Sequence, residues 1–254
     1  MLLDALSARR GIVCLVGAGG KKTTIHRLAA AHPGRLGLAA TVPTLPVPGE
    51  FRDFEVVDEI NLLTDKVVAA SGHARRVAFA KLGDKPPRHG GIPPELVEEI
   101  HVRAGFDATY VKADGARMRW IKAPGEHEPQ LPGSATTVIP IVSARALGEA
   151  LSERIAHRPE LVAAVTGARI GEILSPVHVG RLLASPDGAL RGIGGAVVVP
   201  LINMIDDGRL LAAAREAAHH ALDLSRRFDR VVLARMNAAE PIIEVVGARV
   251  GIAG

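Results

Sequence analysis

Apolar runs separated by polar segments predict an alternation of strands and helices along the chain. The continuous apolar runs at residues 11–16 and 36–42 have the length and composition of strands that are buried on both faces of a sheet. Further strands are predicted at residues 54–57, 77–80, 108–113, 136–142, 196–202, 230–234 and 242–246. Pro140 lies in one of these runs, and because proline lacks a backbone N–H, that strand is expected at a sheet edge or a bulge.

Residues with helical spacing lie between these strands. Helices are predicted at residues 2–9, 24–31, 94–104, 144–156, 158–166, 176–184 and 207–226. The alternation indicates an α/β fold with a doubly wound, mostly parallel sheet, in a three-layer α/β/α arrangement like that of P-loop NTPases. Residues 1–254 are expected to form a single P-loop-like nucleotide-binding domain, with an irregular, basic and proline-bearing loop region around 115–134.

Composition narrows the class of protein. Apolar residues make up 48% of the chain and aromatic residues 3%, so the core must be aliphatic. The formal charge is only +4 and few aromatic side chains are present to stack on bases, which argues against a nucleic-acid partner. Cys14 is the single cysteine and is expected in the core, and no stretch reaches the ~18–20 apolar residues of a membrane span. We therefore expect a cytoplasmic protein that does not bind a membrane.

A glycine-rich segment, GAGGKKTT, joins the first predicted strand to its helix and predicts a phosphate-binding loop. Glycines let the backbone turn sharply and bring N–H groups to an oxyanion, and the helix adds the positive end of its dipole. The spacing G-x-x-G-K is shorter than the common G-x4-G-K-[ST] loop and resembles the tight loop of Mur-type ligases. The expected nucleotide-binding residues are Gly17, Ala18, Gly19, Gly20, Lys21, Lys22, Thr23 and Thr24.

Two roles within this loop stay open at the level of sequence. Either Lys21 or Lys22 is a candidate for the lysine that holds the outer phosphates, and Lys21 is also a candidate catalytic residue. Lys22 stands where a hydroxyl residue usually follows the lysine, so Thr23 is expected to bind Mg²⁺ one residue later. The alternative for the whole segment is a glycine-rich turn with solvent-facing lysines.

Three segments carry a family resemblance: VGAGGKKTT at 16–24, KADGARMRWIKAPGEHEPQLP at 112–132 and PLINMIDD at 200–207. Together they resemble the YqeC family, described as selenium-dependent molybdenum hydroxylase accessory or selenium cofactor biosynthesis proteins. The middle segment is the most specific, because it is similar to the family signature E-A-D-G-[AS]-R…K-A-P-A-E-H-E-P. Lys112, Lys22 and Gly125 depart from the family pattern, which has an acid, a hydroxyl residue and an alanine there. The resemblance implies a role in maturing a selenium-containing molybdenum enzyme.

The middle segment also supplies candidate catalytic and binding residues. Asp114 ends a predicted strand, where an acid beside a phosphate loop can hold Mg²⁺ or orient a water, although an Asp-Gly turn is the alternative. His127 lies between two glutamates and is a candidate proton shuttle or metal ligand, whereas the alternative is an exposed polar loop. Arg117 and Lys122 are expected to neutralise phosphate charge.

Asn203 and Asp206 follow an apolar strand with the spacing of a degenerate guanine-binding N-K-x-D motif, in which Met204 replaces the lysine. In that motif the Asp carboxylate accepts hydrogen bonds from the base. The alternative is a turn that caps the helix beginning near Asp207. The spacing does not establish guanine over adenine.

Two functions are compatible with these patterns. The first is an enzyme that uses Mg²⁺ and ATP or GTP, and that hydrolyses the nucleotide or transfers a phosphoryl or nucleotidyl group to support selenium insertion into a molybdenum hydroxylase. The second is a binding module that holds a nucleotide or a molybdopterin nucleotide without turnover and docks on the hydroxylase. The sequence leaves open the base, the partner and the oligomeric state.

Overall fold

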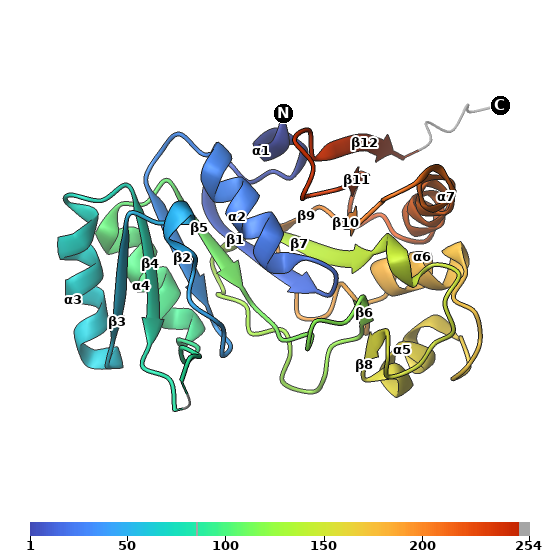
Figure 1. Ribbon diagram of the computed structural model, residues 1–254, viewed down its shortest axis with the longest axis horizontal. Coiled ribbons are helices and arrows are strands. Elements are labelled where there is room, and N and C mark those ends of the chain that lie inside the picture. The colour runs from blue at the N-terminus through green and yellow to red at the C-terminus, as the bar shows by residue number, and fades with distance from the viewer. Residues whose placement is uncertain (85, 249–254) are drawn as a thin grey trace.

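The computed structural model describes residues 1–84 and 86–248 and has a ten-stranded sheet at its centre (Figure 1). The strands of this sheet are β1 (Gly11–Gly17), β2 (Leu36–Ala40), β3 (Phe54–Asp58), β4 (Arg76–Lys81), β5 (Ala108–Lys112), β7 (Ala135–Ser143), β9 (Val197–Val198), β10 (Leu201–Asn203), β11 (Arg230–Ala234) and β12 (Ile242–Gly247). Their order is β12-β11-β10-β7-β1-β5-β2-β4-β3, with β9 paired to β7. The β11–β12 pair is antiparallel and the other pairs of described strands are parallel, which confirms the predicted α/β fold.

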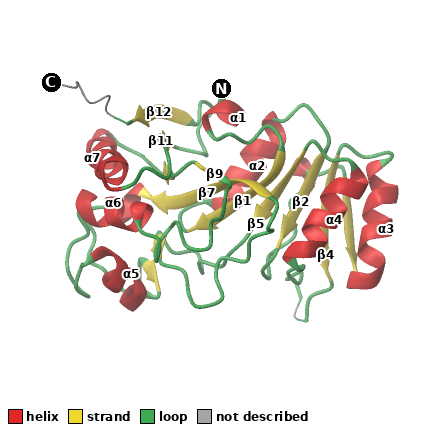
Figure 2. Cartoon of the chain, turned by 180° about the vertical axis from the view of Figure 1, so that it is seen from behind, coloured by secondary structure: helices red, strands yellow, loops and turns green. Residues whose placement is uncertain are grey.

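Helices cover both faces of this sheet in a three-layer arrangement (Figure 2). They are α1 (Leu2–Ala5), α2 (Lys21–Ala31), α3 (Ile60–Ser71), α4 (Pro94–Ala104), α5 (Pro159–Thr166), α6 (Pro176–Ala184) and α7 (Gly208–Leu224), with short 3-10 turns η1 (Gly49–Phe51) and η2 (Ala144–Ala146). A separate two-stranded sheet pairs β6 (Ile121–Lys122) with β8 (Ala156–His157). Within the residues described, none of these helices has the length and apolar character needed to cross a membrane.

The central strand β1 is buried on both faces, as its apolar run predicts. Val13 and Leu15 pack in the cluster beneath α1 and α2, while Ile12, Cys14 and Val16 pack in the cluster beneath α3 and α4. The Cys14 thiol is fully buried, which confirms it as a core residue, and burial raises its pKa. The middle of the sheet is therefore held rigidly, and its carboxyl edge presents the loop that follows β1.

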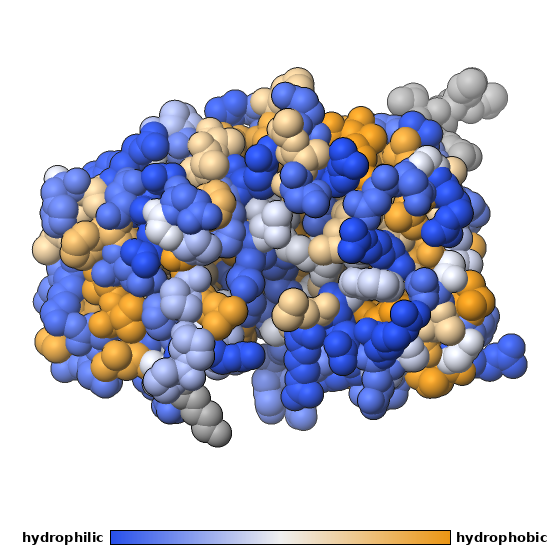
Figure 3. Space-filling model, viewed as in Figure 1, coloured by the Kyte–Doolittle hydropathy of each residue, from blue (hydrophilic) through white to orange (hydrophobic). Residues whose placement is uncertain are grey.

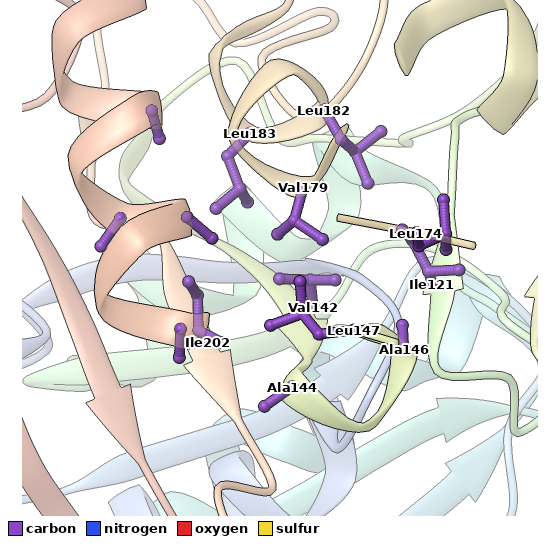
Figure 4. Close-up of a cluster of buried hydrophobic side chains, with 14 of the residues drawn as sticks. Ile121, Val142, Ala144, Ala146, Leu147, Leu174, Val179, Leu182, Leu183 and Ile202 are labelled. Atoms are coloured by element: carbon purple, nitrogen blue, oxygen red, sulfur yellow. The ribbon is translucent and has the colours of Figure 1, made fainter. Parts of the chain in front are cut away.

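A third apolar cluster holds α5, α6 and α7 against the β7–β10–β11 side of the sheet. In Figure 4, Val179, Leu182 and Leu183 of α6 lie beside Val142 of β7 and Ile202 of β10. This cluster fixes the ends of β7 and β10, the two strands that flank the glycine-rich loop on one side.

The predicted helices at 2–9 and 24–31 form as Leu2–Ala5 and Lys21–Ala31, and two larger differences concern whole helices. The predicted helix at 144–156 is wrong: only the η2 turn forms, because Gly148 and Leu151 donate backbone hydrogen bonds to Leu174 and Glu172 instead of continuing a helix. Conversely, α3 forms where no element was predicted, and it buries Leu63, Val67 and Ala70 at helical spacing. The helices at 94–104 and 176–184 and the strand at 230–234 have the predicted bounds.

Pro140 does not lie in an edge strand, since β7 pairs with β1 on one side and with β9 and β10 on the other. The predicted strand at 196–202 is interrupted at Val199–Pro200, between β9 and β10. The carbonyl oxygen of Val138 accepts a hydrogen bond from the backbone N–H of Val199. Pro140 lies two residues further along β7 and its backbone points to the same side, so it faces this interruption. The missing N–H of Pro140 therefore falls where the neighbouring strand is broken, and a central position is tolerated.

We expect Asp207→Ala to lower the free energy of unfolding by about 1 kcal/mol, because the Asp207 carboxylate caps α7 by accepting the N–H of Leu210 at 2.7 Å. Urea denaturation measures the change. Asp223→Ala, an exposed position in the last turn of the same helix, is the control and should alter stability by less than about 0.5 kcal/mol. Equal losses in both variants would contradict the capping role.

Candidate functional site

The glycine-rich loop connects β1 directly to the first residue of α2. Gly17, Gly19 and Gly20 have φ angles of +86°, +97° and +118°, a region that residues with a Cβ rarely adopt. Space is also closed at these positions: a Cβ on Gly19 would lie 2.5 Å from the backbone nitrogen of Ser143, and one on Gly17 would collide with the carbonyl of Ile141. The loop is thus pressed against β7, and glycine is required for both reasons.

Lys21, not Lys22, is the lysine held within the loop. Lys21 is the first residue of α2 and is buried, and its ammonium donates to the carbonyl of Gly17 and lies 2.8 Å from Oδ1 of Asp114. Burial lowers the pKa of Lys21, while the Asp114 charge opposes that shift. Lys22 is exposed. Which of the two lysines holds a phosphate stays a prediction.

Asp114 follows β5 and is buried, with 2% of its surface exposed. Its Oδ2 accepts the N–H of Gly17 at 2.8 Å and lies 2.9 Å from the ammonium of Lys122. Its Oδ1 faces the Lys21 ammonium but has no well-directed hydrogen bond within the described residues. Both oxygens of this buried carboxylate thus face an ammonium group, which balances its charge.

A second acid, Glu128, extends the network. Glu128 Oε2 accepts from Lys122 at 2.8 Å and from Arg158 at 2.5 Å. Burial acts to raise the pKa of Glu128, but the hydrogen bond and charge of Lys122 and the hydrogen bond from Arg158 outweigh it and lower the pKa to about 2. Lys122 is therefore shared between two carboxylates, and it joins the segment after β5 to the glycine-rich loop.

The 115–134 segment is irregular, as predicted, apart from β6, and it is tied down at several points. Gln130 donates its N–H to Ala113 and accepts from the Thr41 hydroxyl at 2.8 Å. Arg117 and His127 lie on this segment and are exposed, so the structure does not bring these two side chains into the buried network. Of the candidates predicted in this segment, Lys122 reaches the network through its ion pair with Asp114, which itself accepts the N–H of Gly17.

The two threonines of the loop sequence have different surroundings. Thr24 is buried and its hydroxyl donates to the carbonyl of Gly20 at 3.1 Å. Thr23 is exposed, and because helical residues are about 100° apart, it lies about 200° around α2 from Lys21. That rotation directs Thr23 away from Asp114, so the geometry does not support the predicted pairing of these two residues around a metal ion.

Asn203 has a structural contact instead of the predicted contact to a base. Its buried amide donates from Nδ2 to the carbonyl of Gly19 at 2.8 Å and accepts the N–H of Met236 at Oδ1 at 3.0 Å. Both polar atoms are thus used within the protein. Asp206 is exposed and pairs with Arg145 at 2.6 Å. Asp207 caps α7, which agrees with the alternative prediction of a helix-capping turn at this position.

Three charged residues near the loop were not among the predicted site residues. Glu128 and Arg158 are partly buried and extend the charge network of Asp114, and Lys112 ends β5 beside the loop. Burial, then the nearby charge of Lys21, lowers the pKa of Lys112 to about 8. Lys112 could have been identified from the sequence, because a cation at the carboxyl end of a buried strand is unusual. The residues around Arg158 give no comparable indication of its ion pair.

The sequence model of the YqeC family, described as YqeC protein, matches residues 13–160. The chain belongs to the YqeC family. Its matched region contains the glycine-rich loop, Asp114, and the Lys122–Glu128–Arg158 network. The chain is also 28% identical over 193 residues to a protein of Escherichia coli (strain K12) named Uncharacterized protein YqeC, covering 73% of this chain and 72% of that protein. No solved structure matches this chain.

Glu128→Gln should lower the free energy of unfolding at pH 7 by about 2 kcal/mol, because it weakens charge-assisted hydrogen bonds to Lys122 and Arg158. A lowered pKa means that this stabilisation is present above the ordinary value of 4.5 and is lost as the pH falls toward about 2. The difference between wild type and variant in urea denaturation should therefore shrink across that range.

Glu126→Gln serves as the matched control, because Glu126 is exposed two residues away. At pH 7 and at the acidic end of that range, it should leave the free energy of unfolding within about 0.5 kcal/mol of wild type. A wild-type-to-Glu128→Gln difference that stays constant with pH would show that the carboxylate charge is not what stabilises the network.

Proposed function

We propose that this YqeC-family protein binds the phosphates of ATP or GTP at residues 17–24 and acts as an accessory protein in the maturation of a selenium-dependent molybdenum hydroxylase. One observation carries the nucleotide part of the proposal. Three glycines with positive φ join a buried strand to a helix, and the first helical residue, Lys21, lies with its ammonium beside Asp114. Backbone N–H groups, a helix N-terminus and a lysine at one point favour a bound polyphosphate.

The charge balance around the loop supports an anionic ligand. Lys21, Lys112 and Lys122 lie near a single buried carboxylate, Asp114, and Lys122 is shared with Glu128. The lowered pKa values of Lys21 and Lys112 reflect burial, and Lys112 also experiences the charges of neighbouring lysines. The charge of a phosphate group would offset the desolvation cost of these ammonium groups and the repulsion between them.

The residues fit a Mg²⁺ ion that arrives with the nucleotide better than a resident ion. Asp114 places one carboxylate beside the loop, and Mg²⁺ is commonly held by one or two carboxylates together with substrate phosphates and water. Two ammonium groups within 3 Å of Asp114 oppose a cation on the protein alone. In the described part of the chain no group of three or more His, Cys, Asp or Glu side chains could hold a metal. Bound Mg²⁺ would supply charge neutralisation at the phosphates.

The alternative is that the protein holds a nucleotide or a molybdopterin nucleotide without turnover. Lys22 occupies the position after Lys21 where a hydroxyl is the usual Mg²⁺ ligand, and both oxygens of Asp114 face ammonium groups. These observations favour binding over hydrolysis, because Asp114 is not placed as a free base. The proposed link to a selenium-dependent hydroxylase, or to its molybdenum cofactor, rests on the family resemblance of the three sequence segments.

A binding panel of ATP, GTP and molybdopterin nucleotides, each with and without Mg²⁺, tests the nucleotide proposal by calorimetry. Lys21→Met should weaken binding by about tenfold or more, since it removes a charge-assisted contact to phosphate, whereas Lys22→Met should weaken binding far less. Circular dichroism verifies that both variants are folded. Unchanged affinity in Lys21→Met, or no binding of any nucleotide by the wild type, rejects the proposed phosphate site.

Release of inorganic phosphate from the nucleotide that binds separates the enzyme from the binding module. Release above the Lys21→Met background supports hydrolysis, while tight binding without release supports the alternative.

The maturation role is tested in a host that makes a selenium-dependent molybdenum hydroxylase. Deleting the gene for this protein should lower the selenium content and activity of the hydroxylase, and the wild-type gene should restore both. The Lys21→Met gene should fail to restore them if nucleotide binding is required. Normal selenium content in the deletion strain contradicts the maturation role and leaves the nucleotide site unaffected.

A further inference from the structure

Lys122 reaches the neighbourhood of the glycine-rich loop from a separate part of the fold. It lies in β6, where it pairs with His157 of β8, and its side chain is 1% exposed. Figure 1 places β6 close to the carboxyl ends of β1 and β7, and Figure 3 shows that this face of the molecule is mainly hydrophilic, with apolar residues scattered over it. Burying an ammonium costs free energy, so its partners indicate what the charge is for.

Three acceptors of the protein surround the Lys122 ammonium. It donates to the carbonyl of Gly115 at 2.7 Å and to Oε2 of Glu128 at 2.8 Å, and it lies 2.9 Å from Oδ2 of Asp114. A lysine ammonium has three N–H groups, so these acceptors match its donors in number. Direct contact with a phosphate would therefore require one of the three contacts to break.

The Lys21 ammonium has fewer contacts. It donates to the carbonyl of Gly17 and lies 2.8 Å from Oδ1 of Asp114, and these are the two acceptors found for it in the described part of the chain. One of its three N–H groups is thus left for a ligand. A phosphate that takes up this ammonium must still compete with Asp114 for it.

The charges of this network do not cancel. Lys21 and Lys122 face Asp114. Lys122 and Arg158 face Glu128, so the network holds three cations and two carboxylates, and one positive charge is in excess among these residues. If Lys21 turned away from Asp114, the carboxylate would keep Lys122 at 2.9 Å and one backbone N–H at 2.8 Å. Lys21 is therefore the cation that can leave without making a buried carboxylate uncompensated.

A glycine makes room for the third cation. A Cβ on Gly125 would lie 2.9 Å from Cζ of Arg158, so glycine leaves space for the guanidinium beside the 125–128 turn. Arg158 thereby supplies Glu128 with a cation of its own. Lys122 is then not fully claimed by Glu128 and stays available to Asp114.

We propose that Lys122 is a positioning residue of the phosphate site: it is the resident counterion of Asp114, and it thereby lets the Lys21 ammonium turn to a bound phosphate. Lys122 itself does not touch the ligand. Without Lys122, Lys21 would be the remaining ammonium beside Asp114 and would stay there. This role depends on the phosphate site proposed above and specifies what makes Lys21 available to it.

A double-variant comparison separates this role from a direct contact. ATP and GTP binding is measured by calorimetry without Mg²⁺, so that a metal contact of Asp114 does not contribute. Lys122→Met should weaken binding about tenfold, because Lys21 then remains on an otherwise unbalanced carboxylate. Asp114→Asn removes the competing charge, so adding Lys122→Met to it should change the affinity by less than about threefold. A direct contact to phosphate would instead cost the same factor in both backgrounds.

Lys66→Met removes an exposed cation outside the network and is the control for a general loss of positive charge, so it should leave binding unchanged. Circular dichroism verifies that the variants are folded. If Lys122→Met does not fold, Glu128→Gln/Lys122→Met removes one charge of each sign and should lose the same factor relative to Glu128→Gln.

The outcomes separate the role of Lys122 from the phosphate site itself. An equal loss in the wild-type and Asp114→Asn backgrounds, or no loss in folded Lys122→Met, overturns the positioning role and leaves the phosphate site intact. If the wild type binds neither nucleotide, the phosphate site is rejected and the role of Lys122 with it.

Discussion

The Asp114 carboxylate joins three parts of the chain that are far apart in sequence. It accepts the N–H of Gly17 at the start of the glycine-rich loop, and it faces the ammonium groups of Lys21 on α2 and Lys122 on β6. A buried charge is stable only when such partners surround it. The loop, the first turn of α2 and the segment after β5 are therefore positioned by one anion, and the convergence of cations on the site follows from the need to balance it.

Much of the fold could be predicted because local patterns encode it. The run at 11–16 is apolar throughout and forms the doubly buried strand β1, and Pro94 begins a helix with the bounds expected. The prediction of a helix at 144–156 was wrong. The composition of this segment suits a helix, but backbone hydrogen bonds to Glu172 and Leu174 decide its conformation. Local propensity is overridden wherever distant segments supply backbone partners.

The candidate site was predictable in part for a similar reason. The glycines and Asp114 were identified from their positions after strands, but the choice between Lys21 and Lys22 depends on where α2 begins, and a shift of one residue rotates a side chain by about 100°. Arg158 was not predicted as a site residue, because its partner Glu128 lies 30 residues away on another segment. Contacts of this kind depend on the assembled fold and leave no local pattern.

Asn203 constrains the direction in which a backbone N–H group of the glycine-rich loop points. Its amide fixes the carbonyl of Gly19, and in a trans peptide unit the carbonyl and the following N–H point in opposite directions. The N–H of Gly20 is thereby aimed away from β10, and a flip of that peptide would break the bond to Asn203. A side chain 184 residues further along the chain thus sets the orientation of one peptide plane in the loop.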